Sequence, residues 1–195
     1  MVFPRRGGEN TADQLVGKRG SFMRWLWYFI IYSFCGFLLE VAFARAAGCS
    51  KQDRKCLLLL PLCPVYGLGA CLILLAASLV QSPLWVLVAG GVAATAAELS
   101  MGLFYRFGLG VEFWDYTGMR GSVGGLICPA FSLCWGVLAL ALVYLVHPSL
   151  APLVERIPPE LAPPALCLLG ADALVSCVAL RRTGGTEVLR WYAPG

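Results

Sequence analysis

Two glutamates interrupt long apolar stretches of this chain and are its clearest candidates for chemistry. Glu40 lies in WLWYFIIYSFCGFLLEVAFA, and Glu98 lies in the apolar stretch that ends near Tyr105. Inside a membrane an acidic side chain is costly, so it faces protein or water and is a functional candidate. A neutral carboxyl group would donate a hydrogen bond across helices, whereas a charged one would need an arginine or a bound cation.

The two glutamates therefore leave two roles open. They could belong to a site that binds a substrate or ion, or they could be buried hydrogen-bonding groups for a tyrosine or for backbone freed near Pro61 and Pro64. A third acid, Asp172, lies near the middle of the last apolar stretch, and there we expect a structural role.

An acidic aromatic cluster, EFWDY at 112–116, lies between two apolar stretches. Tryptophan and tyrosine at a membrane boundary are commonly anchors. Acidic groups beside aromatic faces could also recognise a cation or amine. Alternatively, Asp115 could cap the turn before Gly118, which is the interpretation we favour.

No motif of an enzyme or cofactor site is present. GxSxG, HExxH, GxGxxG and the ATP-binding GxxxxGK[ST] are absent, and there is no CxxC among the nine cysteines. The one histidine, His147, precedes a proline and is expected at the membrane interface rather than as a base. We therefore predict no catalytic residue, metal site or cofactor. Whether Cys49 and Cys56 pair stays open.

The composition shows what must position these residues. Of the 195 residues, 59% are hydrophobic and 13% are charged, whereas a soluble domain carries about 25% charged residues. Apolar stretches of about 20 residues are long enough to cross the hydrocarbon of a bilayer. The net charge of +4 is not gathered in a basic stripe with aromatics, so we expect contact with the lipid bilayer and not with nucleic acid.

We predict an all-α integral membrane bundle of about five transmembrane helices, one of them broken by proline. It would be a multi-pass protein of the cell membrane. The expected spans are residues 25–44, 57–80, 84–105, 123–146 and 165–180. They divide the chain into a polar tail at 1–24, a four-span core at 25–147, a Pro-rich loop at 148–164, the fifth span at 165–180 and a polar tail at 181–195.

The second span carries the break, in the segment PLCPVYG. Two prolines three residues apart remove backbone donors, so the chain there should be irregular and buried in protein or lining a cavity. Glu40 and Glu98 both lie on faces of small residues, which let helices approach closely. We predict that these faces pack together and bring both carboxyl groups near one cavity beside Tyr66, with Trp114 and Asp115 at its mouth.

These segments together resemble the small bacterial membrane proteins of the family named Putative ABC-transporter type IV, the CmpB-like permeases. The resemblance covers about residues 29–148. It rests on YSFCGFLLE, PLCPVYGLGA, Glu98, WDY, GLIC, FSLCWG and the closing HP, in that order. The chain departs from the family at Leu60 and Gly124, where a glycine and an asparagine are usual.

The resemblance implies a membrane transport component: a permease-like subunit whose ATPase, if present, is a separate nucleotide-binding chain. A homo-oligomer is left open. The alternative is a structural or interaction membrane protein without transport activity, and a small membrane-embedded enzyme is a third. Candidate substrate- or ion-binding residues are Glu40, Tyr66, Glu98, Trp114, Asp115 and Tyr116. Residues expected to have structural roles are Gly36, Pro61, Pro64, Gly67, Gly125 and Trp135.

Overall fold

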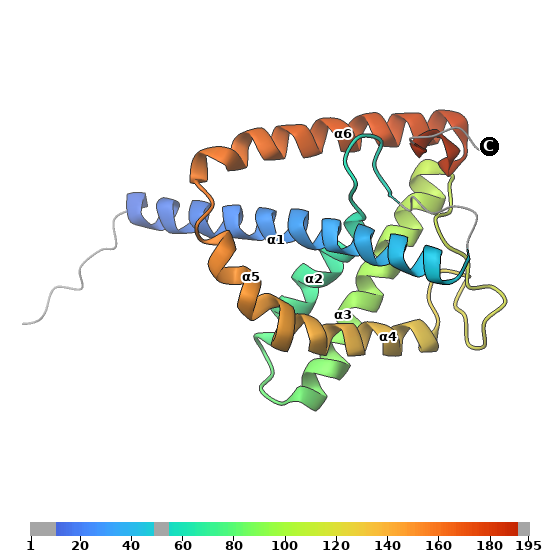
Figure 1. Ribbon diagram of the computed structural model, residues 1–195, viewed down its shortest axis with the longest axis horizontal. Coiled ribbons are helices and arrows are strands. Elements are labelled where there is room, and N and C mark those ends of the chain that lie inside the picture. The colour runs from blue at the N-terminus through green and yellow to red at the C-terminus, as the bar shows by residue number, and fades with distance from the viewer. Residues whose placement is uncertain (1–10, 49–54, 191–195) are drawn as a thin grey trace, which may run out of the picture.

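The computed structural model describes residues 11–48 and 55–190, and these residues form helices joined by one long connector (Figure 1). The first helix, α1, is Thr11–Ala46 and begins well before the expected start at residue 25. Residues 11–24 were predicted to belong to a polar tail, but they are helical. This stretch contains no proline and several strong helix formers, so the helix of the span continues outward without a break.

The second crossing starts with a non-helical segment, residues 56–63, which we call the hook. The backbone N–H of Cys56 donates to the carbonyl of Leu62 (3.0 Å), which closes the hook on itself. The backbone N–H of Cys63 then donates to the carbonyl of Ser33 in α1 (3.0 Å). The irregular backbone predicted around PLCPVYG is therefore present and is held by other parts of the protein.

The helix that follows the hook, α2, is Pro64–Ala77 and is shorter than the expected span of 57–80. Pro61 has no N–H and disfavours a helical conformation in the residue before it. Pro64 lies in the first helical turn, where a proline removes no hydrogen bond. The two prolines thus determine where α2 begins and do not kink it. At about 1.5 Å per residue, α2 is about 21 Å long and cannot cross the hydrocarbon alone.

The third crossing consists of α3, Pro83–Leu103, and a π-helical continuation, η1, Phe104–Leu109. It ends at Gly110, whose φ of 72° is readily adopted by glycine. A connector, residues 110–128, then leads to the fourth crossing. That crossing consists of α4, Pro129–Ala141, the π-helical segment η2, Leu142–Val146, and α5, His147–Val154.

The fourth crossing does not stop at His147-Pro148, as the sequence predicted. Pro148 falls in the first turn of α5, directly after the wider turn of η2. Its missing N–H is tolerated at that position, so the helix continues to Val154. Most of the expected Pro-rich loop is consequently helical, because the short helix η3, Pro159–Leu161, leads into α6, Ala162–Thr183. The chain then makes a last helical turn, η4, Thr186–Leu189.

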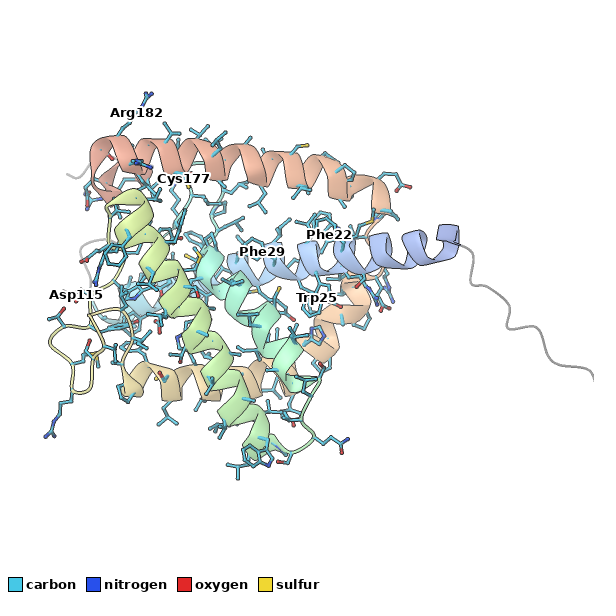
Figure 2. All side chains as sticks on the ribbon, turned by 180° about the vertical axis from the view of Figure 1, so that it is seen from behind. Phe22, Trp25, Phe29, Asp115, Cys177 and Arg182 are labelled. Carbon is cyan, nitrogen blue, oxygen red and sulfur yellow. The ribbon has the colours of Figure 1, made fainter. Side chains whose placement is uncertain are left out.

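Four segments of the described residues are long and apolar enough to cross a membrane: Gly20–Ala46, Pro83–Leu109, Pro129–Val154 and Pro159–Thr183. With α2 they make an all-α membrane bundle, which confirms the predicted fold class. Large apolar side chains cover its outer surface: Phe107 is 78% exposed and Leu145 is 71% exposed. Such surfaces suit lipid, and Figure 2 shows the side chains that surround the helices.

The ends of these segments define two boundaries. The N-terminal part of α1, the end of α5 and the start of α6 lie at the same end of the bundle (Figure 1). The connector lies at the other end. The helices α1 and α6 run in the same direction, as expected when three further crossings separate them (Figure 1).

The centre of the bundle is held by close helix contacts. α2 packs between α1 and α3, and α3 packs against α4. Small residues allow these approaches: a Cβ placed at Gly136 would lie 2.8 Å from the carbonyl oxygen of Leu87. At Gly67 a Cβ would lie 2.1 Å from the hydroxyl oxygen of Ser33. The prediction that the Glu40 face of α1 and the Glu98 face of α3 pack directly on each other is wrong, because α2 lies between these two helices.

Candidate functional site

The first part of the site joins α1 to the first turn of α2. The Tyr66 hydroxyl donates a 2.7 Å hydrogen bond to Oε1 of Glu40. Tyr66 is positioned by the helix start at Pro64, and its ring packs directly on Gly36, where a Cβ would lie 2.2 Å from the ring. Glu40 is only part-buried. It faces the bundle with a tyrosine as its partner, one of the roles that the sequence left open.

The second part joins α3 to the connector. The Tyr116 hydroxyl donates a 2.9 Å hydrogen bond to Oε1 of Glu98, which is only 4% exposed. The backbone N–H of Tyr116 donates to the carbonyl of Gly125 (2.8 Å), and its ring stacks on Phe131 at 4.6 Å between centroids. Burial, and then the neighbouring Glu98 carboxylate, raise the pKa of Tyr116. Its hydroxyl therefore keeps the proton that it donates.

The two tyrosine–glutamate pairs belong to one polar cluster. The ring of Trp135 in α4 lies 5.1 Å from that of Tyr66, between centroids. The carboxyl groups of Glu40 and Glu98 are also close enough for their charges to interact. The structure thus brings together the two glutamates and Tyr66 and adds Tyr116. Their role in binding stays a prediction.

Three polar atoms in or next to this cluster are buried and have no hydrogen-bond partner among the described residues. They are Oε2 of Glu98, Nε1 of Trp135 and Oγ of Ser33. Buried polar groups are nearly always paired, because leaving one unpaired costs about 1–3 kcal/mol. The unpaired atoms include an acceptor, a donor and a hydroxyl that can act as either. A water molecule, ion or polar solute could satisfy them.

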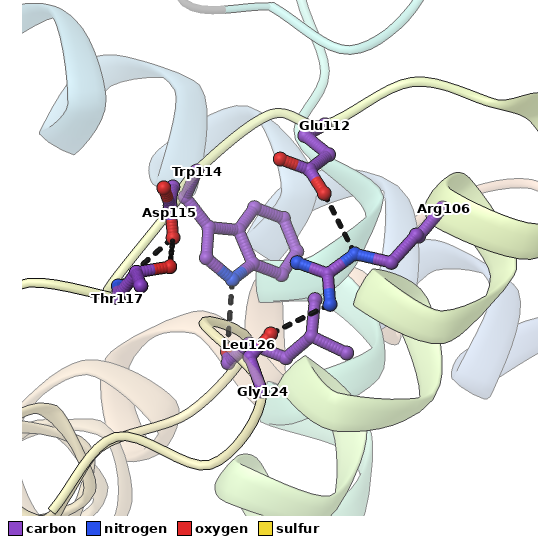
Figure 3. A network of polar contacts seen from close by, with 7 residues as sticks. All are labelled: Arg106, Glu112, Trp114, Asp115, Thr117, Gly124 and Leu126. Carbon is purple, nitrogen blue, oxygen red and sulfur yellow. Dashed lines mark hydrogen bonds and ion pairs between the residues drawn. The ribbon is translucent and has the colours of Figure 1, made fainter.

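Arg106 organises the connector rather than pairing with a buried glutamate. Its Nε lies 2.7 Å from Oε1 of Glu112, and its Nη1 donates to the carbonyl of Gly124 at 2.6 Å (Figure 3). Both side chains are partly exposed, so the ion pair itself contributes little stability. The bond to Gly124 fixes the second half of the connector beside η1.

Trp114 and Asp115, which the sequence predicts at the mouth of the carboxylate cluster, make their hydrogen bonds within the connector. The indole N–H of Trp114 donates to the carbonyl of Leu126 (2.9 Å), and the ring covers Gly102 of α3. Asp115 is exposed and turned toward Thr117, away from the indole (Figure 3). Hydrogen bonding within the connector determines both positions, and sequence order alone could not reveal it.

Asp115 closes a local turn, as the favoured interpretation predicted. Its Oδ1 accepts hydrogen bonds from the backbone N–H of Thr117 at 2.8 Å and from the Thr117 hydroxyl. A Cβ at Gly125 would lie 2.6 Å from the same carboxylate oxygen, and the φ of Gly125 is +74°. This position therefore requires glycine on two grounds. The hydroxyl and backbone donors of Thr117, with a smaller effect of Arg106, lower the pKa of Asp115.

Thr117→Val should raise the pKa of Asp115 toward its ordinary value of about 3.9, because one of its two local donors is lost. A carboxyl group whose pKa is lowered by folding stabilises the fold above its ordinary pKa. That stabilisation is lost as the pH falls from about 4 through the lowered folded-state pKa. The measurement is an NMR titration of the Asp115 carboxyl carbon. Thr183→Val, which removes a hydroxyl bonded to the α6 backbone, is the control. An unchanged Asp115 pKa in Thr117→Val would contradict this assignment.

Asp172 has the structural role that the sequence predicts. It lies in α6, is 2% exposed, and receives the backbone N–H groups of the hook: Leu59 donates to Oδ1 at 3.0 Å and Leu60 to Oδ2 at 2.7 Å. The neighbouring Ser176 hydroxyl accepts from the N–H of Leu58 at 2.8 Å. The expected structural role of Asp172 thus has a specific geometry. The signal available in the sequence was an acid inside an apolar stretch.

Two further predictions concern residues outside the cluster. His147 was expected at the interface, but it lies within the fourth crossing, where its Nδ1 is 2.9 Å from the Tyr32 hydroxyl of α1. Cys56 is buried, and Cys49 lies outside the described residues. The described residues contain no group of three His, Cys, Asp or Glu side chains that could hold a metal ion.

Comparison with known proteins agrees with the motifs. The sequence model of the family described as Putative ABC-transporter type IV matches residues 27–178. That range includes every member of the carboxylate cluster, the hook and Asp172. No significant match was found among curated proteins or among solved structures. Because the matched range covers more than half of the chain, this membrane protein belongs to the family described as Putative ABC-transporter type IV, which associates it with transport.

Proposed function

We propose that this chain is a permease-like subunit of a cell-membrane transport system and that its carboxylate cluster binds the transported solute. The observation that carries the proposal is the meeting of Glu40–Tyr66 and Glu98–Tyr116 beside the unpaired Glu98 Oε2. Irregular backbone beside buried acids is how many transporters build a substrate or ion site. The cluster suits a cation or a small solute rich in hydrogen-bonding groups.

Energy would come from a separate nucleotide-binding ATPase, because GxxxxGK[ST] is absent from the sequence. Affinity purification of the tagged full-length protein from its own membranes tests this. We expect a chain with a nucleotide-binding motif to co-purify and the complex to hydrolyse ATP in proteoliposomes. Co-purification with non-transport membrane proteins alone would instead support a structural or interaction role.

The structural or interaction role has one observation in its favour. Asp172 shows that this bundle uses a buried acid purely to hold backbone, and both glutamates have tyrosine partners. If Glu40 and Glu98 do the same, replacing them with glutamine should change stability but no activity. The glutamine variants therefore separate the two functions.

Glu98→Gln should leave the protein folded, because the amide can still accept from Tyr116, but it should reduce ATPase activity of the complex in proteoliposomes by about tenfold or more. The loss of a charge that contacts the solute would produce this effect. Glu112→Gln, an exposed carboxyl group outside the cluster, is the matched control. Glu98→Leu should also lose stability, since it leaves the Tyr116 hydroxyl without its acceptor. If Glu98→Gln keeps the wild-type ATPase activity, the cluster has no part in transport.

A further inference from the structure

A cavity of about 320 Å³ lies far from the carboxylate cluster, between the N-terminal part of α1 and the turn that joins α5 to η3. Its walls include Gly20, Arg24 and Trp27 on one side and Val154, Glu155 and Pro159 on the other. This volume lies at the lower end of the range for small-ligand sites. Trp25, labelled in Figure 2, marks this part of α1.

The cavity lies at the depth in the bilayer where lipid headgroups lie. Val154 and Pro159 are the residues at which two membrane-length segments end and start. Both line the cavity, so it lies at one boundary of the bilayer. Tryptophan is enriched at this depth, because its ring is apolar and its N–H is polar. Trp27 and the buried Val154 give the cavity an apolar wall beside its charged groups.

The charges of the cavity match a ligand that carries both signs. Nη1 of Arg24 and Oε1 of Glu155 are 4.0 Å apart, and their side chains are 53% and 62% exposed. At this separation and exposure the pair contributes little stability by itself. Both groups are therefore available to a ligand. A guanidinium group binds phosphate through several N–H donors, and a carboxylate accepts from an ammonium group.

We propose that this cavity binds the headgroup of an amino phospholipid, with the phosphate at Arg24 and the primary ammonium at Glu155. The first acyl carbons would then lie along Trp27 and Val154. A purely anionic headgroup would leave the Glu155 carboxylate without a cation and beside a negative charge. A quaternary ammonium group would offer Glu155 no N–H donor. The site thus favours phosphatidylethanolamine over phosphatidylglycerol and phosphatidylcholine.

Native mass spectrometry of the full-length protein tests this, after exchange into equimolar phosphatidylethanolamine, phosphatidylglycerol and phosphatidylcholine with matched acyl chains. We expect wild type to retain phosphatidylethanolamine about tenfold more than either competitor, as loss of a charged hydrogen bond would predict. Glu155→Gln should abolish this preference. Arg24→Gln should lower retention of all three lipids, and Arg24→Lys should restore part of it.

The matched control is Arg156→Gln, which removes a neighbouring charge that does not line the cavity. It should keep the wild-type preference. Soluble glycerophosphoethanolamine, added as a competitor of phosphatidylethanolamine, distinguishes the source of the headgroup. If it displaces the lipid only weakly, the ligand is a membrane lipid. If it binds as strongly as the lipid, the same site is filled by a headgroup from solution. Equal retention of the three lipids by wild type, or an unchanged preference in folded Glu155→Gln, would overturn the proposal.

Discussion

Replacing Asp172 with alanine is expected to lower the free energy of unfolding by about 2–6 kcal/mol, since two backbone N–H groups inside a membrane-spanning bundle lose their acceptor at about 1–3 kcal/mol each. These are the N–H groups of Leu59 and Leu60, which donate to the carboxylate at 3.0 and 2.7 Å. Asp172 lies near the middle of the segment Pro159–Thr183, where no bulk water can replace the lost acceptor. Much of the protein should fail to accumulate in the membrane.

Thermal unfolding and yield in mild detergent measure this effect. Asp172→Asn should be less damaging, because its amide keeps one oxygen acceptor. Leu174→Ala on the same helix is the control: its side chain is 67% exposed and faces away from the hook. If Asp172→Ala is as stable as Leu174→Ala, the hook does not depend on this carboxylate.

Gly67→Ala is expected to be the second most damaging substitution, with a loss of about 1–3 kcal/mol for an overpacked contact. The added Cβ would lie 2.1 Å from the Ser33 hydroxyl oxygen and 2.5 Å from the carbonyl oxygen of Phe29. The second atom is backbone, so the clash cannot be relieved by a rotamer change. α1 and α2 would have to separate, which would also lengthen the bond between Tyr66 and Glu40.

The matched control is Gly170→Ala in α6, where a Cβ would meet nothing within 4 Å. Alanine favours helix by about 1 kcal/mol over glycine, so this variant should be neutral or more stable. Unfolding temperatures in detergent compare the two. Equal stability of both variants would show that α1 and α2 are not in close contact at Gly67.

The placement of the hook has a consequence for the transport proposal. Its backbone is bonded to Asp172 and Ser176 of α6 and to Ser33 of α1, and it leads directly into Tyr66 at the start of α2. Any movement of α6 relative to α1 would therefore be transmitted to the tyrosine that holds Glu40. This connects the bundle's outer helices to the carboxylate cluster.

The sequence by itself determined the class of the protein and the identity of its buried acids. Length and hydropathy of a segment are local properties that add along the chain, so they were sufficient to predict a multi-pass helical bundle. A carboxyl group inside an apolar stretch must find a partner, so the positions of Glu40, Glu98 and Asp172 in the sequence were enough to single them out. Order and spacing of the motifs were enough to identify the family.

Only the tertiary structure decided which groups meet. Leu59 and Leu60 of the hook are more than 110 positions from Asp172, and no local pattern specifies that their N–H groups lie opposite that carboxylate. The indole N–H of Trp114 donates to the carbonyl of Leu126, a partner that the order of residues in the sequence did not indicate. The helix continues past Pro148 because the turn before it widens. Hydrogen bonds are directional and short, so their partners depend on how the helices pack, and a single sequence does not specify that packing.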